Sequence, residues 1–204
     1  PHYTRSRFIK LIEREISNAK QGLPAYMNLK MNSLSDYQII DKLYDASNAG
    51  VKIKLQVRGI CSLIPGIKGM SENIKVISIV DRYLEHSRIF YFQNAGNPEL
   101  YCSSADWMSR NLDRRIELMF PILEKAAFDE VKKILDSYFK DNTNAMELSQ
   151  TGSWTPVEKD KKDLLLKKEI DVDLLDKLIN ENKYYDAYHT ALSYIEVKMR
   201  NKKE

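Results

Sequence analysis

An alternating stretch at residues 51–58, preceded by a helical pattern, is the feature that most constrains the fold of this chain. In residues 51–58 (VKIKLQVR), apolar and polar side chains alternate strictly, which is typical of a β-strand with one buried face. Residues 36–49 before it carry helical spacing, and residues 26–31 form another short strand pattern. A strand, a helix and a strand in this order predict a right-handed crossover and a parallel pair of strands.

The sequence also marks the ends of the predicted helices. Residues 35–38 (SDYQ) fit a capping-box pattern, which satisfies free backbone N–H groups at the start of a helix. Gly50 suits the left-handed backbone conformation that often closes a helix. Another helix is predicted at residues 5–20, where apolar residues recur at helical spacing, and Gly22 and Pro24 end it.

The rest of the pattern completes an α/β fold. Strands are predicted at residues 74–80, 86–92, 100–104 and 116–122, and a further helix at 124–140. A turn at residues 94–98 would join two of these strands as a hairpin. Residues 59–73 hold three glycines and a proline, and loops of this length are often functional. We therefore predict a mixed sheet flanked by helices.

A change of composition near residues 152–156 (GSWTP) marks a predicted boundary. Residues 1–154 form the predicted α/β domain and carry the whole net charge of +3. Residues 155–204 hold equal numbers of basic and acidic residues, and their apolar residues recur at helical spacing. We expect a C-terminal helical appendage that docks on the domain or on a partner, with its role left open.

Composition narrows the classes of function. A net charge of +3 and a pI of about 8.7 lack the concentrated basic charge of a general nucleic-acid binder, so anions are expected only where a few arginines converge. Cys61 and Cys102 show no disulfide framework and no metal-ligand spacing, which favours a cytoplasmic location. No signal peptide is visible, and no apolar run reaches the roughly 20 residues that cross a bilayer. Because residue 1 is Pro and not Met, we expect a piece of a longer or processed protein.

Residues 84–88 (LEHSR) contain one of only three histidines in the chain. If residues 86–92 form a strand, His86 and Arg88 lie on the same face and Glu85 on the other. An imidazole has a pKa near neutrality, and a guanidinium binds two phosphate oxygens at once. The pair favours phosphoryl chemistry, with a structural histidine at a strand start as the alternative.

Other polar groups are expected near this pair. Arg58 ends the alternating strand beside Gly59, and ligands of α/β sheets bind beyond the carboxyl ends of parallel strands. Residues 103–115 hold three arginines, three serines and two aspartates. The arginines and serines suit phosphate oxygens, and the carboxylates either orient those arginines or hold a metal. Lys30 and Asn32 end the first strand and could join the same rim. In each case the alternative is a solvated surface group that pairs locally.

Five segments together resemble the C-terminal region of the bacterial polyphosphate kinase family. The segments are residues 30–34 (KMNSL), 57–61 (VRGIC), 71–74 (SENI), 84–88 (LEHSR) and 104–115 (SADWMSRNLDRR). The resemblance runs from about residue 3 to about residue 122, and several long motifs at matching spacing make it specific.

The resemblance implies an enzyme that reversibly transfers the terminal phosphate of ATP to inorganic polyphosphate and needs magnesium. It implies two C-terminal domains similar to the phospholipase D fold, whose hallmark is a His-x-Lys motif, each giving one histidine to a shared tunnel. This chain looks like the second domain, and the histidine that becomes phosphorylated belongs to the first. The implied partners are ATP or ADP, polyphosphate, the remaining kinase domains and, in the full-length enzyme, a second copy. The implied location is cytoplasmic, with membrane association through the full-length enzyme.

The resemblance also assigns site residues. Residues 86–88 (HSR) match the His-x-Lys motif with Arg in place of Lys. His86 is the predicted catalytic residue, and His86 and Arg58 are predicted to contact the nucleotide phosphates. Arg88 and Arg115 are added as phosphate or polyphosphate contacts. No metal ligand is predicted, and without the first half-site the chain is not expected to make polyphosphate alone.

Two alternatives stay open. The first is a phosphodiesterase or nuclease of the phospholipase D type, which needs a histidine motif from each of two halves and usually an Asp six residues after the Lys. Asn94 occupies that position here, which counts against this class, although two copies of His86 in a homodimer could complete the site. The second is a non-catalytic module that binds polyanions or mediates oligomerisation.

Overall fold

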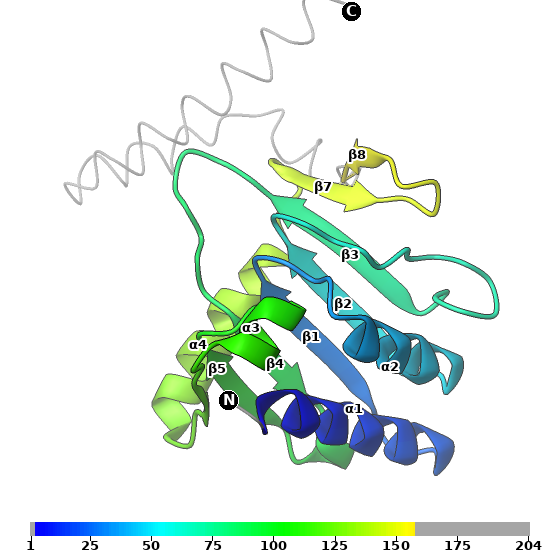
Figure 1. Ribbon diagram of the computed structural model, residues 1–204, viewed down its shortest axis with the longest axis vertical. Coiled ribbons are helices and arrows are strands. Elements are labelled where there is room, and N and C mark those ends of the chain that lie inside the picture. Colours follow the sequence, from blue (N-terminus) through cyan, green and yellow to red (C-terminus); the bar gives the residue numbers. More distant parts are fainter. Residues whose placement is uncertain (1–2, 158–204) are drawn as a thin grey trace, which may run out of the picture. The chain divides into compact units, whose positions relative to one another are not determined.

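A computed structural model describes residues 3–157, which form one mixed β-sheet with helices on both faces (Figure 1). The helices are α1 (Thr4–Lys20), α2 (Tyr37–Asn48), α3 (Ser109–Arg114) and α4 (Lys125–Tyr138), and a 3-10 turn η1 spans Asn94–Gly96. The strands are β1 (Tyr26–Met31), β2 (Lys52–Val57), β3 (Ile74–Ile79), β4 (Ile89–Phe92), β5 (Glu99–Ser103), β6 (Met119–Pro121), β7 (Ala145–Leu148) and β8 (Trp154–Pro156). The helical appendage predicted at residues 155–204 lies, from residue 158 on, outside the described residues.

The sheet follows the order β6-β5-β4-β1-β2-β3-β7-β8. Strands β1, β2 and β3 are parallel, and every other pair of neighbours is antiparallel. The predicted parallel pair around α2 and the predicted hairpin of β4 with β5 are both confirmed. Because β8 pairs with β7, the sheet continues beyond residue 154, where the domain boundary was predicted.

Alternation along the strands divides the apolar side chains between two layers. On one face, α1 and α2 pack on the larger core, to which β1 contributes Leu29 and β4 contributes Phe90. On the other face, α4 places Leu135 on a smaller cluster with Ile89 and Tyr91 of β4. Strand β4 is therefore buried on both sides, which explains why its sequence is an unbroken apolar run. Figure 1 shows α1 and α2 on one side of the sheet and α4 behind it.

The start of α2 differs from the predicted capping box. Asp36 is the N-cap residue, and its carboxylate accepts a hydrogen bond from the backbone N–H of Ile39 at 3.2 Å. The backbone N–H groups of Ser35 and Asp36 both donate to the carbonyl of Trp107. Ser35 therefore belongs to a contact between two loops and not to the helix start. Gly50 has a φ of +91° and follows the end of α2, as predicted.

The predicted strand at residues 86–92 begins three residues later than expected, at Ile89. Ile89 is the first residue of β4, and it pairs with Lys30 of β1. Before Ile89 the ladder with β1 does not continue, and side chains bind the backbone carbonyls of residues 85–87 instead. His86 and Arg88 thus lie in an irregular segment before the strand, and the prediction that they form part of it was wrong.

Elements near the ends of the described region were also missed. Helix α3 lies within the polar segment 103–115, which showed no amphipathic pattern because the helix is only six residues long. Strands β7 and β8 were not predicted, since each is short and lacks clear alternation. Strand β6 spans only Met119–Pro121 of the predicted 116–122.

Candidate functional site

The candidate site lies at the carboxyl ends of the parallel strands β1 and β2. Lys30 is near the end of β1, Asn32 follows this strand, and Arg58 follows β2. The connection from β3 to β4, which contains His86, passes along the same side of the sheet (Figure 1). This is the edge at which open α/β sheets bind their ligands, as expected from the sequence.

Asp106 is the centre of a hydrogen-bond network at this edge. Its Oδ1 accepts from the backbone N–H of Asn32 at 2.7 Å and from that of Ser33 at 3.2 Å. Both of its oxygens accept from Arg88, with 3.2 Å from Nε to Oδ1 and 3.0 Å from Nη2 to Oδ2. Burial acts to raise the pKa of Asp106, but the hydrogen bonds from Arg88 and Asn32 outweigh it and hold this pKa below its ordinary value. Asp106 is therefore ionised and orients Arg88, which lies outside the segment 103–115 whose own arginines it was predicted to orient.

Three consecutive backbone carbonyls around His86 are held by side chains from this network. The ammonium of Lys30 donates to the carbonyls of Glu85 at 3.1 Å and Ser87 at 2.9 Å. The carbonyl of His86 accepts from Arg88 Nη1 at 3.1 Å and, more weakly, from Asn32 Nδ2 at 3.5 Å. The irregular segment is therefore fixed in place by cationic and amide donors below it.

Lys30 is fully buried, which is rare for a lysine. Burial lowers its pKa to about 8, although the charge of Glu85 partly opposes this effect. The Tyr138 ring of α4 lies 5.0 Å from the ammonium, and the Tyr138 hydroxyl donates to the Glu85 carboxylate at 2.5 Å. Glu85 thus contacts α4 and not the His86 ring.

The imidazole of His86 lies on the surface with Arg88 beside it. Arg88 Nη1 is 3.1 Å from His86 Nδ1. The positive charge of Arg88 lowers the pKa of His86, with smaller contributions from desolvation and from Arg58. His86 is therefore expected to be neutral at pH 7, with its ring available to a ligand.

Arg58 joins the same network through Asn32. Its Nε donates to Asn32 Oδ1 at 2.5 Å, while the Asn32 amide nitrogen donates to Asp106 at 3.2 Å. The adjacent Gly59 donates its backbone N–H to the Asn32 carbonyl at 2.8 Å. Asn32 thus connects Arg58 with the Asp106 and Arg88 pair, and the structure brings Arg58, His86 and Arg88 together.

Arg115 has a separate environment. Its Nε lies 3.3 Å from the carboxylate of Glu117, and its side chain is 62% exposed whereas that of Glu117 is 3% exposed. Glu117 also accepts hydrogen bonds from Ser104 and Asn111. Arg115 is thereby anchored at one end with its guanidinium facing solvent, but its ion pair lies outside the network of Asn32 and Asp106.

Sequence reasoning identified part of this network. Lys30 and Asn32 were expected only as members of a rim, because they stand at the end of the first predicted strand. Their roles as hydrogen-bond donors to the His86 segment depend on tertiary contacts, which no local sequence pattern predicts. Tyr138 was missed altogether, since an aromatic residue at the end of an amphipathic helix is usually part of the core.

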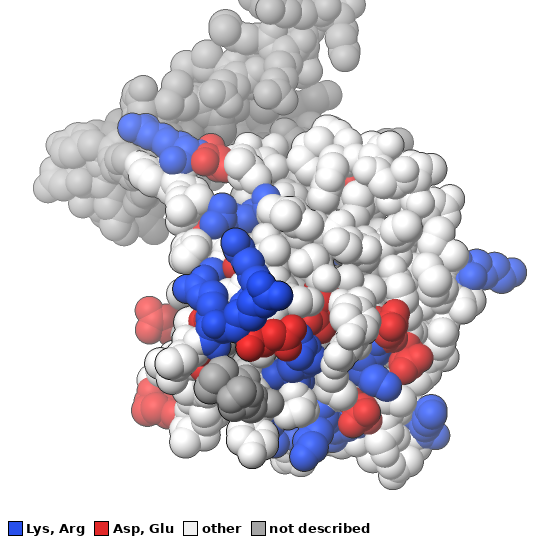
Figure 2. Space-filling view, in the orientation of Figure 1, with Lys and Arg blue, Asp and Glu red and all other residues white. Residues whose placement is uncertain are grey.

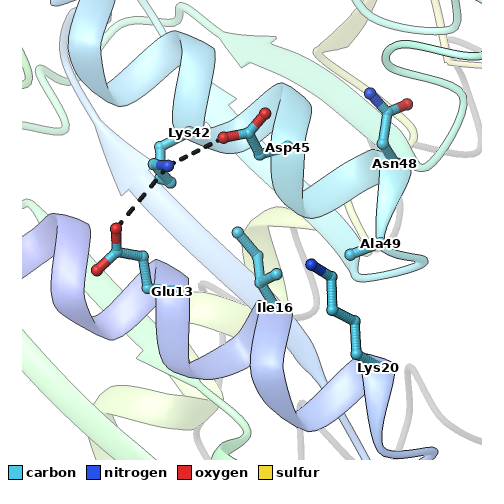
Figure 3. Close-up of a pocket in the computed structure, with 7 residues that line it drawn as sticks. All are labelled: Glu13, Ile16, Lys20, Lys42, Asp45, Asn48 and Ala49. Atoms are coloured by element: carbon cyan, nitrogen blue, oxygen red, sulfur yellow. Dashed lines mark hydrogen bonds and ion pairs between the residues drawn. The ribbon is translucent and has the colours of Figure 1, made fainter.

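A cavity of about 460 Å³ lies elsewhere, between α1 and α2 (Figure 3). Its lining includes Lys42, which pairs with Asp45 at 2.9 Å and with Glu13 at 3.8 Å. Residues of the C-terminal halves of both helices, Lys20 and Asn48 among them, complete it. It therefore lies away from the Asp36 end of α2 and shares no lining residue with the network around Asp106.

Surface charge supports a local and not a diffuse anion site. On the face shown in Figure 2, Lys and Arg side chains gather in small groups with Asp and Glu beside them.

Within residues 3–157, no group of three or more His, Cys, Asp or Glu side chains is arranged to hold a metal ion. The same residues include no helix with the length and apolar character needed to span a membrane.

The sheet topology and the strand-end network define the class of this domain. It is an α/β domain with a mixed sheet, as predicted, and with a cluster of N–H donors at the carboxyl edge of that sheet. The chain belongs to the polyphosphate kinase family, since residues 1–167 match the family described as polyphosphate kinase C-terminal domain 2.

Individual relatives agree with this assignment. The chain is 50% identical over 154 residues to a polyphosphate kinase of Rhodopirellula baltica, covering 76% of this chain and 18% of that protein. It is 49% identical over 145 residues to the polyphosphate kinase of Escherichia coli strain K12, covering 71% of this chain and 21% of that protein. The chain therefore spans about a fifth of the length of these curated relatives.

Solved structures show the same fold. The polyphosphate kinase of Porphyromonas gingivalis is similar with a TM-score of 0.75 and 45% identity, over 78% of this chain and 24% of that one. NucT of Helicobacter pylori is similar with a TM-score of 0.51 and 12% identity, over 69% of this chain and 91% of that one. The second likeness concerns the fold alone.

Proposed function

We propose that this chain is the part of a polyphosphate kinase that binds the phosphate groups of ATP and of polyphosphate. In the whole enzyme, the terminal phosphate of ATP is transferred reversibly to inorganic polyphosphate. The observation that carries the proposal is the network in which Asn32 links Arg58 to the Asp106 and Arg88 pair beside His86. The names of the relatives supply polyphosphate, the family resemblance supplies ATP, and the network offers donors that suit the phosphates of both.

The donors fit the needs of phosphoryl transfer. This reaction depends mainly on positioning and on stabilising negative charge at the transferring oxygens. Groups that are already oriented contribute most, because they need no reorganisation when charge develops. Arg58 is oriented by Asn32, and the His86 segment is oriented by Lys30, Asn32 and Arg88. His86 and Arg58 are therefore the proposed contacts of the nucleotide phosphates.

The same donor set does not suit magnesium. Mg²⁺ prefers oxygen ligands, and Asp106, the carboxylate of this network, already accepts N–H groups at both oxygens. Within the described residues, the network consists otherwise of guanidinium, ammonium, amide and imidazole groups. Magnesium is accordingly proposed to come with the nucleotide.

The remaining domains of the kinase are the proposed partners of this site. They would supply the phosphorylated histidine, because the family resemblance places that histidine in the first of the two C-terminal domains and this chain resembles the second. Arg115 is proposed as a further contact of the polyphosphate chain, because its guanidinium is anchored by Glu117 and faces solvent. Isolated from those domains, this chain is expected to bind phosphates without turnover.

Calorimetric titration tests the proposal. The chain is titrated with magnesium ATP and with long-chain polyphosphate at two salt concentrations, as wild type, Arg58→Ala and His86→Ala. Each substitution should weaken binding by about tenfold, the scale of a lost charge-assisted hydrogen bond. Lys125→Ala, on the exposed side of α4, is the matched control and should bind like wild type.

Two other outcomes would contradict the proposal. An affinity that is the same in wild type and in both variants, and that is lost at high salt, would indicate a diffuse basic surface. Hydrolysis of a phosphodiester by the chain would instead support the phospholipase D type of activity. That activity would require a second histidine motif from another copy.

A further inference from the structure

The guanidinium of Arg88 lies between Asp106 and His86. Its Nε and Nη2 donate to the Asp106 carboxylate, and its Nη1 lies 3.1 Å from both the carbonyl oxygen and the ring Nδ1 of His86. A guanidinium carries five N–H groups, two of them on Nη1. These contacts engage both hydrogens of Nη1 and leave one hydrogen of Nη2 for another partner. Most N–H groups of Arg88 therefore have partners within the protein, unlike those of an arginine whose guanidinium is free to bind phosphate.

The chemistry of this guanidinium decides which ring nitrogen of His86 carries a hydrogen. An arginine side chain stays protonated in proteins and has no acceptor atom. The Nη1–H group that faces Nδ1 can be satisfied only by the lone pair of Nδ1. A neutral imidazole has one N–H group, so in this arrangement the hydrogen of His86 is on Nε2.

We propose that Arg88 is a positioning residue that holds His86 as the neutral tautomer with its hydrogen on Nε2. His86 then presents an N–H donor to a phosphate oxygen at the candidate site. The identity of that phosphate rests on the proposed function, whereas the tautomer is a property of the free chain.

The charged groups around His86 agree with a neutral ring. Arg88, Arg58 and Lys30 all disfavour an imidazolium, whereas Asp106 favours it. Protonation of Nδ1 would also place its N–H group against that of Arg88 Nη1, where two donors would face each other. The Nδ1 lone pair is thus retained while Arg88 stays in place.

This tautomer limits the chemistry that His86 can perform. Nucleophilic attack on phosphorus needs a free ring lone pair, but Nδ1 is engaged by Arg88 and Nε2 carries hydrogen. Full release of the Nε2 hydrogen from a neutral ring would leave an imidazolate, which is unfavourable near neutral pH. His86 therefore stabilises phosphate charge by hydrogen bonding and acts neither as nucleophile nor as proton donor. A phosphodiesterase that uses its histidine as nucleophile would need the opposite arrangement.

Nuclear magnetic resonance of the ¹⁵N-histidine-labelled chain tests the tautomer without any ligand. Two-bond correlations between ring nitrogens and carbon-bound ring hydrogens distinguish protonated from unprotonated nitrogens near neutral pH. The signals of His86 are identified by their loss in His86→Gln. We expect a protonated Nε2 and an unprotonated Nδ1 in the wild type.

Variants of Arg88 separate positioning from a merely structural role. Arg88→Lys should retain the tautomer, because an ammonium also only donates, whereas Arg88→Met should lose the preference and raise the pKa of His86. Arg115→Met, which removes an arginine outside the network, should leave the His86 signals unchanged.

A protonated Nδ1 in the wild type would overturn the proposal, and that measurement needs no variant to fold. A spectrum of folded Arg88→Met identical to wild type would overturn it too. Failure to bind ATP would instead overturn the proposed function and leave the tautomer assignment standing.

Discussion

Arg88 and Asp106 form a bidentate ion pair in which both side chains are largely buried, with 13% and 9% of their areas exposed. Two parallel N–H to oxygen bonds give this pair a defined geometry. The pair links the segment that carries His86 to the loop after β5. Its integrity is therefore expected to control both stability and the position of His86.

Asp106→Asn should destabilise the domain by about 3 kcal/mol, because it removes one partner of a buried pair and leaves the other charge uncompensated. Urea unfolding measures this change. Asp129→Asn is the matched control, since it removes the partner of Lys125 in an exposed pair and should cost less than about 0.5 kcal/mol. Equal effects of the two substitutions would contradict the role given to Asp106.

Lys30 should make stability depend on pH in the alkaline range. Its pKa falls from 10.5 in the unfolded chain to about 8 in the folded protein, so between these values the unfolded chain binds more protons. The free energy of unfolding should then rise as pH increases through this window. Relative to Lys30→Met, which cannot titrate, wild type should gain about 1 kcal/mol between roughly pH 7 and pH 9.

Paired urea titrations of wild type and Lys30→Met at those two pH values measure the difference. Lys125→Met, which removes an exposed lysine of α4, controls for the loss of a positive charge. A difference between wild type and Lys30→Met that stays constant with pH would show that Lys30 keeps an ordinary pKa.

A β-carbon at position 59 should be destabilising. An alanine there would place its Cβ 2.9 Å from the carbonyl oxygen of Asn32 and 3.0 Å from the hydroxyl of Ser33. Because the first of these atoms belongs to the backbone, relief requires a shift of the loop that orients Arg58. We expect Gly59→Ala to cost about 1–3 kcal/mol in stability and to weaken ATP binding as well.

Thermal unfolding and calorimetry of Gly59→Ala measure the two effects. Ser62→Ala, an exposed position in the same loop, is expected to change neither. Unaltered ATP affinity in Gly59→Ala would mean that Arg58 does not need its observed position.

Substitution of Trp107 should lower the free energy of unfolding much more than substitution of Trp154. Its ring is fully buried and packs 5.1 Å from the rings of both Phe8 and Phe90. Trp107→Leu should therefore cost about 3 kcal/mol, close to the range for truncation of large core side chains. Trp154→Leu, at a position that is 37% exposed on β8, should cost much less when both are measured by denaturant unfolding.

Local patterns were sufficient for the elements that have a regular period and a buried face. The strand at 26–31 and the parallel pair around α2 follow from alternation, from helical spacing and from the handedness of crossovers. The start of β4 could not be predicted from the same patterns. The run of apolar residues shows where burial begins, but the end of pairing depends on where β1 stops.

The candidate site was predictable in its members more than in their roles. Arg58, His86 and Arg88 stand at positions where a sheet gathers ligands, and the structure brings them together as expected. The contacts of Arg88 with Asp106 join residues 18 positions apart in sequence, and those of Lys30 with Ser87 join residues 57 apart. Such pairings arise from the tertiary fold, so a single sequence gives no sign of which polar groups are supports and which remain available to a ligand.

The central claim is that a phosphate of ATP meets His86 beside Arg58. The most direct test titrates magnesium ATP into the ¹⁵N-histidine-labelled chain and follows the ring resonances of His86. A saturable shift of the Nε2 signal that is absent in Arg58→Ala is the predicted result. Saturable ATP binding that leaves the His86 resonances unmoved would place the nucleotide elsewhere and contradict the account.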